Sequence, residues 1–527
     1  MTRTITSWNK NHNLFEYTSG RFLFNEDIRR TERRVQFDVD ALVSALCCAT
    51  KRPASDLAGI SKLAEGGFNR VLEATFIDGY EVIVRLPYRI TVPKYLATAS
   101  EAATLDLLRH NGVPVPKVLA YSADESNPVG TEYIMLEKLE GTPLSEQWFS
   151  MNNKSRAKIV KQIVEVEKKL MAIPFPASGS LFYRKDLGES QLIVPITGQS
   201  DQVVLGPTVQ YEWWYRERSL LDVDRGPSYC QRYGKPRLHV ERYLRELHQF
   251  KAMSPAVHTR LLSDYLKLAP YLDIPSDHPL ARPVLRHPDF SPNNILVNSS
   301  NDIVGIIDWQ HAVVLPLCLC AGIPDHFQNW GDPISETLAK PETQLPENFE
   351  SLDRSEQELI QETMRRRLVH FYYAALTMRQ MPEHFDALRD ENSMLRAKLF
   401  NRAGAPWEGD SQSLRYAIMQ VCKNWPMRIG NSGPAQPVDC PVHFAEEEML
   451  QCTKDHDQEQ EKLQELAEMR EIIGIDAVGW VPDDEHLEKS RAIAQSIKAG
   501  LMEHSKSDLE RTAVLDHFPF DDHDEEV

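Results

Sequence analysis

The chain has few cysteines, no long hydrophobic run and no excess of basic residues. Its 8 cysteines in 527 residues are too sparse for a disulfide framework, and the first residues do not form a secretory signal. We therefore expect reduced thiols in an intracellular protein. The longest apolar stretch, residues 312–323, is interrupted by Pro316 and is much shorter than the roughly 20 residues that span a bilayer. No transmembrane segment is expected.

The charge is negative and unevenly spread. The chain holds 59 Lys and Arg against 77 Asp and Glu, a formal net charge of −18. Residues 441–527 hold 24 acidic and 8 basic side chains, so the rest of the chain is almost neutral. Nucleic acid is not expected as a partner, because phosphate backbones are bound by clustered Lys and Arg and no such stripe is present. The acidic end either solubilises the chain or binds a basic protein partner.

Hydrophobic periodicity predicts two kinds of structure along the chain. A helix at 38–48 precedes strands at 60–63, 71–76 and 81–86, and the Asp78-Gly79 pair between the last two is typical of a hairpin turn. A helix at 99–108 and strands at 115–120 and 132–136 complete a small five-stranded lobe with one helix. The remainder is mostly helical, for example at 154–171, 239–250 and 356–378. The sequence therefore predicts a β-rich lobe followed by a larger, mainly α-helical lobe.

Two further segments differ from this pattern. Residues 193–236 are rich in Gly, Pro and aromatic residues and form either a binding wall or an ordered surface insertion. Residues 445–473 carry Leu463, Leu466, Met469 and Ile473 at helical spacing. We expect an N-terminal extension (1–54), a nucleotide-binding N-lobe (55–140), a helical C-lobe (141–440) with the insertion at about 193–236, and an acidic helical C-terminal extension (441–527).

The stretch 285–309 is the most informative part of the sequence. It is expected to form a loop, a strand, a turn and a second strand, with Asn294 opening the first strand and Asp308 closing the second. Antiparallel pairing about the turn then puts Asn294 beside Ile307 and Asp308. An amide oxygen and a carboxylate at one end of a hairpin are hard ligands suited to Mg²⁺. Asp289 lies a few residues upstream, in the loop.

These residue types match the needs of phosphoryl transfer. In that reaction a carboxylate accepts the proton of an attacking hydroxyl, and metal ions neutralise charge on the transferred phosphate. Asp289 is our candidate for the catalytic base, and Asn294 and Asp308 are our candidates for the metal ligands. For His287 we prefer a role in orienting the backbone of the loop over a role in proton transfer.

The spacing His287-x-Asp289, four residues, Asn294, with Asp308 fourteen residues later, resembles the aminoglycoside phosphotransferase family, relatives of the protein kinases. Residues 14–21, 63–69 and 127–130 look most similar to the fungal altered-inheritance-of-mitochondria phosphotransferase-like proteins. The resemblance implies an α+β, protein-kinase-like two-lobed fold, with a small antiparallel β N-lobe carrying one helix and a larger mainly α-helical C-lobe. It also implies ATP and Mg²⁺ as cofactors.

The resemblance implies roles for further residues. The loop that covers the nucleotide phosphates corresponds to Gly66, Gly67, Phe68 and Asn69, although a Gly-Gly pair alone is usually just a turn. Arg85 stands where the family has a phosphate-contacting lysine, and Glu101 would be its ion-pair partner. The alternative is a surface arginine on a strand and an unrelated glutamate on a helix. The hinge that presents backbone groups to adenine corresponds to the segment from Glu137 to Leu139.

The leading hypothesis is an ATP-dependent phosphotransferase that moves the γ-phosphate to a hydroxyl of an unidentified small molecule. His287-Pro288-Asp289 and Trp309 differ from the protein-kinase signatures and argue against a protein substrate. Because arginine is not interchangeable with lysine at a phosphate site, Arg85 puts efficient catalysis in doubt. The alternative is a catalytically weak or inactive kinase-fold protein that acts as a binding or scaffold factor in mitochondrial maintenance.

Other classes of site find no support in the sequence. Paired Cys-x-x-Cys zinc motifs, a Gly-x-Ser-x-Gly elbow and a His-Glu-x-x-His helix are all missing. The first acidic residue is Glu16, and Arg3 and Lys10 precede it among several Ser and Thr. This composition keeps a mitochondrial presequence open beside a cytoplasmic location.

Overall fold

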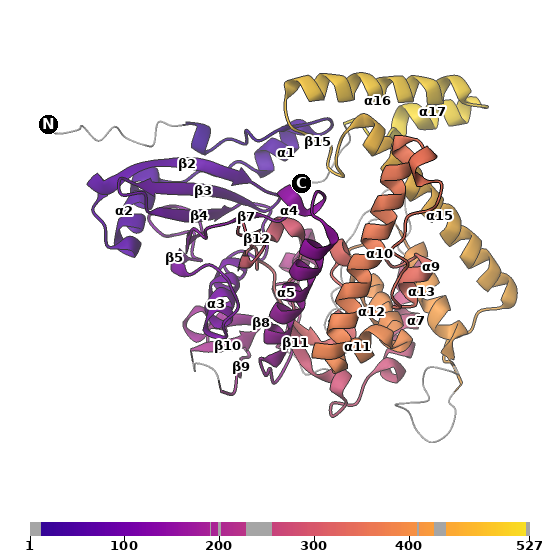
Figure 1. The fold of residues 1–527 in the computed structure, drawn as a ribbon, viewed down its shortest axis with the longest axis horizontal. Helices are drawn as coiled ribbons and strands as arrows, with labels where there is room; N and C mark the ends of the chain where they lie inside the picture. Colours follow the sequence, from indigo (N-terminus) through magenta and orange to yellow (C-terminus); the bar gives the residue numbers. More distant parts are fainter. Residues whose placement is uncertain are drawn as a thin grey trace. The chain divides into compact units, whose positions relative to one another are not determined.

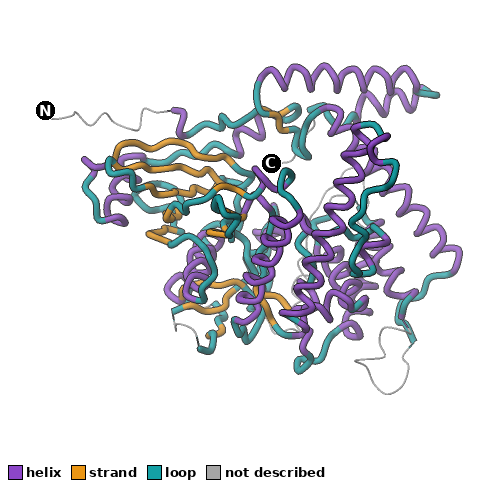
Figure 2. The backbone as a smooth tube through the Cα atoms, in the orientation of Figure 1, coloured by secondary structure: helices purple, strands orange, loops and turns teal. Residues whose placement is uncertain are grey.

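The computed structural model describes residues 12–189, 191–198, 202–227, 256–407, 410–425 and 439–522. It divides into two compact units. Unit 1 comprises Met1–Thr91, Leu119–Leu136 and Thr453–Val527, and unit 2 comprises Val92–Val118 and Glu137–Cys452. Figures 1 and 2 show the largest sheet in unit 1 and mostly helices in unit 2. The domain boundaries expected from the sequence remain a prediction.

Unit 1 is built on a five-stranded sheet of order β2-β3-β4-β6-β5. Strands β2 and β3 pair antiparallel, as do β3 and β4, and the second pairing places Val71 opposite Arg85. The Asp78-Gly79 turn joins β3 to β4, with Gly79 at a φ of 84° that favours glycine. The strands are Leu57–Glu65 (β2), Asn69–Phe76 (β3), Glu81–Pro87 (β4), Val118–Ser122 (β5) and Tyr133–Glu137 (β6).

Helix α2 (Val39–Thr50) packs on this sheet. Asp38 caps it by accepting a hydrogen bond from the backbone N–H of Ala41 at 2.9 Å. Its apolar face, which the sequence periodicity predicts, is buried against the apolar sides of β3 and β4. The predicted helix, the hairpin and the five strands are all confirmed.

In unit 1, a segment near the start of the described residues pairs with one near their end. Strand β1 (Arg21–Phe22) pairs antiparallel with β15 (Trp480–Val481). A separate small hydrophobic core is formed by Phe24, Ile473, Ala494, Phe518 and Phe520. Unit 1 also contains α1 (Glu26–Glu32), the part of α15 (Glu446–Ile473) from Thr453 onward, α16 (Asp484–His504) and α17 (Asp508–His517).

Helix α15 confirms the helix predicted for residues 445–473. Its predicted apolar stripe is only partly right. Ile473 is buried in the small core, and Leu466 and Met469 pack against that core. Leu463 is instead 54% exposed. Helical spacing alone does not reveal where a long helix leaves its packing partner.

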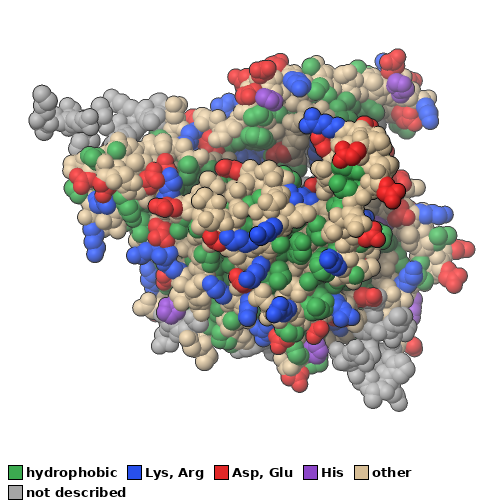
Figure 3. Space-filling view, in the orientation of Figure 1, with side chains coloured by type: hydrophobic (Ala, Val, Ile, Leu, Met, Phe, Trp, Pro, Cys, Tyr) green, Lys and Arg blue, Asp and Glu red, His purple; other side chains and the backbone are tan. Residues whose placement is uncertain are grey.

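Unit 2 is mainly helical. Its central helix pair is α5 (Asn153–Ala172) with α10 (Arg354–Gln380). Helix α5 buries Ile159, Ile163 and Leu170, while its Lys-rich solvent face is visible as a group of blue side chains in Figure 3. Among the described residues, unit 2 also contains α3 (Leu96–His110), α7 (Ala256–Leu272), α11 (Pro382–Arg389), α12 (Glu391–Gly404) and α13 (Gln412–Lys423).

Several segments between these helices form short, paired β-strands in unit 2. Strand β7 (Thr142–Pro143) pairs with β12 (Ile295–Val297), which pairs with β13 (Ile303–Ile306). Helix α3 packs on β8 (Ser180–Tyr183), and β8 pairs with β10 (Val203–Gly206), which lies in the predicted insertion. The described part of unit 2 also contains β9 (Val194–Pro195), β11 (Pro283–Leu285) and β14 (Val314–Pro316).

Most of the predicted helices are present. Helices α5 and α10 confirm those predicted at 154–171 and 356–378. The helix predicted at 239–250 lies outside the described residues, as does the end of the predicted insertion beyond Pro227. The predicted α+β fold, with a small antiparallel sheet unit and a larger mainly helical unit, is confirmed. Among the described helices, none combines the length and apolarity needed to cross a membrane.

Candidate active site

The hairpin of β12 and β13 brings the predicted metal ligands to one end. Ile295 pairs with Ile306, and the backbone N–H of Ile307 donates to the carbonyl oxygen of Asn294 at 3.0 Å. Asn294 therefore lies beside Ile307, as predicted, and Asp308 follows directly. Asp308 is exposed and has a φ of 65°, a left-handed conformation that is uncommon outside glycine.

The loop before the hairpin holds Asp289 against Asn294. The side-chain amide of Asn294 donates to the carbonyl oxygen of Asp289 at 2.9 Å and to its carboxylate Oδ2 at 3.0 Å. The Ser291 hydroxyl also donates to this Oδ2, at 3.3 Å. Asn294 is buried, whereas Asp289 is exposed. Because Nδ2 of Asn294 faces Asp289, its Oδ1 is the atom with which it would bind a metal.

His287 links the loop to the hairpin. Its Nδ1 accepts from the backbone N–H of Asp289 at 3.1 Å, so Nε2 carries the proton donated to the carbonyl oxygen of Ile307 at 2.9 Å. Burial lowers the pKa of His287, against the opposing effects of the Ile307 carbonyl and of nearby Asp308. The ring of Trp309 packs on it, with centroids 4.5 Å apart. This neutral histidine has the geometry of a residue that orients the backbone.

A buried ionic network lies behind the loop and was not found from the sequence. Nε of Arg286 donates to Oε1 of Glu167 at 3.1 Å, and its Nη1 donates to the carbonyl oxygen of Cys320 at 2.6 Å. The Tyr373 hydroxyl donates to the second oxygen of Glu167. The side chain of Glu167 is only 2% exposed. The one sequence feature that could have indicated this network is the position of Arg286, directly after an apolar strand and before His287.

In the described residues, no group of three or more His, Cys, Asp and Glu side chains gathers around a metal position. Asp308 and Asn294 nevertheless offer oxygen donors of the kind that magnesium uses. Magnesium is usually bound through one or two carboxylates and completes its shell with water and phosphate oxygens. The donor set of the hairpin fits that ion.

The predicted phosphate loop lies between β2 and β3 of unit 1. Its turn is closed by the backbone N–H of Gly66, which donates to the carbonyl oxygen of Asn69 at 3.0 Å. A Cβ added to Gly66 would have no neighbour closer than 3.8 Å, and one added to Gly67 would meet open space. Neither glycine has a positive φ. The fold alone therefore does not require glycine at these two positions.

The other predicted nucleotide-binding residues belong to both units. Phe68 presents its carbonyl oxygen to the backbone N–H of Tyr88 at 2.9 Å, and Arg85 is buried in β4. Glu101 of α3 is buried in unit 2. Because Arg85 and Glu101 lie in different units, their ion pair remains a prediction.

The predicted hinge residues are tied into unit 2. The backbone N–H of Lys117 donates to a carboxylate oxygen of Glu137 at 2.8 Å, and Arg109 donates to the same oxygen at 2.5 Å. A Cβ on Gly305 would clash with Leu139, so glycine makes room for that side chain. The side chains of Glu137 and Leu139 thus position the segment, and a nucleotide contact would use its backbone.

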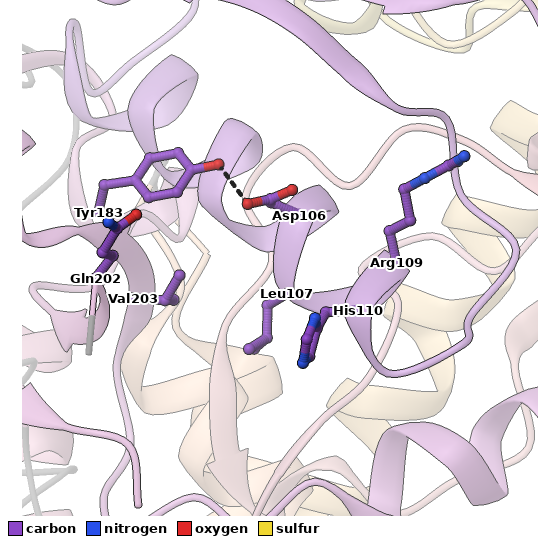
Figure 4. A pocket seen from close by; sticks show the side chains of 7 residues that line it. All are labelled: Asp106, Leu107, Arg109, His110, Tyr183, Gln202 and Val203. Atoms are coloured by element: carbon purple, nitrogen blue, oxygen red, sulfur yellow. Dashed lines mark hydrogen bonds between the residues drawn. The ribbon is translucent and has the colours of Figure 1, made fainter. Parts of the chain in front are cut away.

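Two cavities in unit 2 are lined by other residues. One of about 690 Å³ is lined by Glu140 to Thr142 and by the turn at Asn298, at the end of the hairpin opposite Asn294. The other, of about 250 Å³, lies between α3 and β8, where the Tyr183 hydroxyl donates to Asp106 at 3.0 Å (Figure 4). Neither is lined by a predicted site residue.

Comparisons with known proteins agree with the phosphoryl transfer predicted from Asp289, Asn294 and Asp308. The model of the phosphotransferase enzyme family matches residues 60–318, which include Asp289, Asn294 and Asp308. A subtelomeric hrmA-associated cluster protein of Aspergillus fumigatus is 34% identical over 474 residues, covering 81% of this chain and 89% of that protein. The chain belongs to the phosphotransferase enzyme family. Family membership supports kinase-like phosphoryl transfer as the class of reaction.

Other similar proteins are more distant in sequence. "Altered inheritance of mitochondria protein 9, mitochondrial" of Yarrowia lipolytica is 23% identical over 511 residues, covering 89% of this chain and 84% of that protein. This likeness confirms the relationship to the fungal proteins expected from the sequence. A solved ternary complex of an aminoglycoside phosphotransferase with streptomycin and ATP is 13% identical, covers 74% of this chain and 97% of that chain, and has a TM-score of 0.37.

Proposed function

We propose that the protein transfers the γ-phosphate of ATP to a hydroxyl group of a small molecule. The observation that carries this proposal is the assembly of Asp289, Asn294 and Asp308 at one end of a hairpin. The residue Asp289 is exposed, and its carboxylate accepts hydrogen bonds from the side chains of Asn294 and Ser291. An oriented, accessible carboxylate is what a general base requires.

Asp289 would accept the proton of the acceptor hydroxyl as its oxygen attacks the γ-phosphorus. The bond from that phosphorus to the ADP oxygen breaks, and a bond to the acceptor oxygen forms. Asn294 and Ser291 hold the receiving carboxylate in place. His287 keeps the peptide of Asp289 and the end of β13 together without changing its own charge.

Asn294 and Asp308 would hold Mg²⁺ through Oδ1 and the carboxylate. When bound, this ion neutralises negative charge on the phosphates. The uncommon backbone of Asp308 supports this assignment, since conformations of this kind cluster at functional sites. The phosphate contacts are assigned to the loop Gly66 to Asn69 and to Arg85, with Glu101 as the proposed ion-pair partner of Arg85. The adenine contacts are assigned to the segment from Glu137 to Leu139.

The two glycines support the assignment of the loop. The protein itself leaves room for a side chain at Gly66 and Gly67. A phosphate that binds backbone N–H groups would need that space, because a Cβ would hold it away from the loop. On this basis we assign nucleotide binding to residues 55–140 and catalysis to residues 141–440.

A second candidate function is a weakly active or inactive scaffold in mitochondrial maintenance. Arg85 favours it, because arginine replaces the usual lysine and is buried in β4. The names of the relatives in Yarrowia and Candida favour a mitochondrial location over a cytoplasmic one. In this role the acidic C-terminal extension would be the surface for a protein partner.

Thermal unfolding with and without Mg-ATP tests the nucleotide site. At about 100 times its dissociation constant, a ligand stabilises the folded state by roughly 2.7 kcal/mol. The wild-type protein should show a magnesium-dependent rise in melting temperature that Asp308→Ala loses. No shift in folded wild-type protein would reject the proposed catalytic function and favour the scaffold.

A further inference from the structure

We propose that β15 and α16 hold the phosphate loop (Gly66–Asn69) in position through an N-terminal anchor segment (Tyr17–Phe22). The C-terminal extension would thereby set how tightly the loop binds nucleotide phosphate. This inference rests on the proposed function, because it concerns the affinity for Mg-ATP. All contacts in the argument lie within unit 1.

Glu65 is the point where the anchor segment reaches the loop. Its carboxylate accepts from the backbone N–H of Thr18 at 2.8 Å, from the hydroxyl of Ser19 at 2.8 Å and from Nη2 of Arg70 at 2.8 Å. The side chains of Glu65 and Arg70 are fully buried. Glu65 and Arg70 are also paired across β2 and β3, one residue outside each end of the Gly66–Asn69 turn. The anchor segment therefore closes the base of the loop.

Arg70 extends this contact to the rest of the N-terminal region. Its Nη1 donates to the carbonyl oxygen of Leu14 at 2.8 Å, and its Nη2 donates to that of Arg33 at 3.0 Å. Although burial would raise it, the donors Thr18 and Ser19 and the charge of Arg70 hold the pKa of Glu65 below its ordinary value. Losing the N-terminal contacts would leave a buried ion pair short of partners.

The other side of the anchor segment is bound by the C-terminal elements. Phe22 pairs with Trp480, and Arg21 pairs with Val481, in the β1–β15 ladder. Nε1 of Trp480 donates to the hydroxyl of Tyr17 at 2.9 Å, and Arg21 forms an ion pair with Asp484 of α16. Only Gly20 separates Ser19, which binds Glu65, from β1. A displacement of β15 would thus be felt at Glu65.

A substitution at Gly20 would push the anchor segment away from β15. A Cβ at this position would lie 2.5 Å from the carbonyl oxygen of Val481 and would clash with the indole of Trp480. Its φ is not positive, so a side chain would be excluded by this close approach alone. In contrast, a Cβ on Gly500 in α16 would meet no atom within 4 Å. Gly500→Ala is therefore a matched control in the same part of the chain.

Holding the loop should matter for binding, because ordering a loop when ligand arrives costs free energy that a preorganised loop has already paid. If β15 were loosened, the loop would have to become ordered on binding, and the free energy of nucleotide binding would be less favourable. We expect Gly20→Ala to weaken Mg-ATP binding by about threefold to tenfold. Trp480→Phe keeps an aromatic ring but removes the donor to Tyr17, and it should have a smaller effect in the same direction.

The test compares wild type, Gly20→Ala, Trp480→Phe and Gly500→Ala in the full-length protein. Hydrogen exchange of the amides at 64–70 is measured without nucleotide, and the Mg-ATP dissociation constant is measured by calorimetry. Faster exchange with weaker binding in the first two variants, and neither change in the control, is the expected result. A melting curve of each variant shows that it is folded.

Several outcomes would overturn the inference. Unchanged exchange at 64–70 would show that β15 does not hold the loop, and faster exchange with unchanged affinity would show that the hold does not affect binding. If Gly20→Ala does not fold, Trp480→Phe decides by the same two measurements. Wild-type protein that binds no Mg-ATP would reject the proposed function itself, whereas equal binding by wild type and variants would reject only this inference.

Discussion

The side-chain amide of Asn294 donates to both the carbonyl oxygen and a carboxylate oxygen of Asp289, at 2.9 and 3.0 Å. One residue therefore orients the proposed base and offers its own Oδ1 to the proposed metal. Four residues separate them in sequence, and His287 links the backbone of Asp289 to Ile307 of the hairpin. The geometry of the base thus depends on the same backbone that presents Asp308.

Replacing Asp289 with asparagine should remove phosphoryl transfer and keep nucleotide binding. The amide cannot take the proton of the acceptor hydroxyl, and loss of a general base typically costs about 10²- to 10⁴-fold in rate. Transfer of labelled γ-phosphate from ATP to a library of hydroxylated small molecules measures the rate. Asn293→Ala, at an exposed position of the same loop, is the control. Equal transfer by Asp289→Asn and wild type would show that Asp289 is not the base.

Alanine at Gly66 or Gly67 should weaken Mg-ATP binding without destabilising the protein. The structure leaves room for both methyl groups, so the free energy of unfolding should change by no more than about 0.5 kcal/mol. The same substitution at Gly59, which also meets open space in β2, should leave both quantities unchanged. Calorimetry and urea unfolding measure the two effects. Normal affinity in both loop variants would contradict the role of the loop in phosphate binding.

The parts of the site that the sequence predicts are those made by neighbours along the chain. Asn294 and Ile307 are joined by one hairpin, so strand pattern and turn residues are sufficient to place them together. The partners of Arg286 are not accessible in this way, because Glu167 and Tyr373 lie on two helices far away in sequence. Periodicity marks Ile163 and Leu170 as a buried face of α5, but it does not reveal that Glu167 shares this face with a buried cation.

The same limit applies to the two ends of the chain. The resemblance of residues 14–21 to the fungal proteins marks that segment as significant. It does not show which residues the segment contacts. A two-residue pairing between Phe22 and Trp480 is too short to leave a strand pattern in the sequence. Similarly, burial of Glu65 depends on Arg70 and on Ser19, and each of these residues alone looks like an ordinary surface residue.

Neutralising Glu167 should strongly destabilise unit 2. Glu167→Gln leaves the buried guanidinium of Arg286 without its counter-charge, and breaking a buried ion pair on one side typically costs about 3–5 kcal/mol. The control is Glu165→Gln, which removes a surface pair with Lys161 at 3.6 Å and should cost at most about 1 kcal/mol. Urea unfolding of both variants at neutral pH gives the comparison. Similar stabilities would mean that the network adds nothing to the support of the loop before Asp289.

Acid should destabilise the protein partly through His370. This histidine is fully buried in α10, where its Nδ1 accepts from the backbone N–H of Asn329 at 2.9 Å, and burial lowers its pKa to about 4. The unfolded chain takes up the proton at about pH 6.5, so the folded state loses stability as the pH falls from about 6.5 to 4 and keeps it above that range. The full loss is about 3 kcal/mol. His370→Gln, whose side chain still offers an acceptor, should reduce the slope of unfolding free energy against pH in this window. Exposed His326→Gln should leave the slope as it is, and an unchanged slope in His370→Gln would contradict the assignment of acid sensitivity to this buried ring.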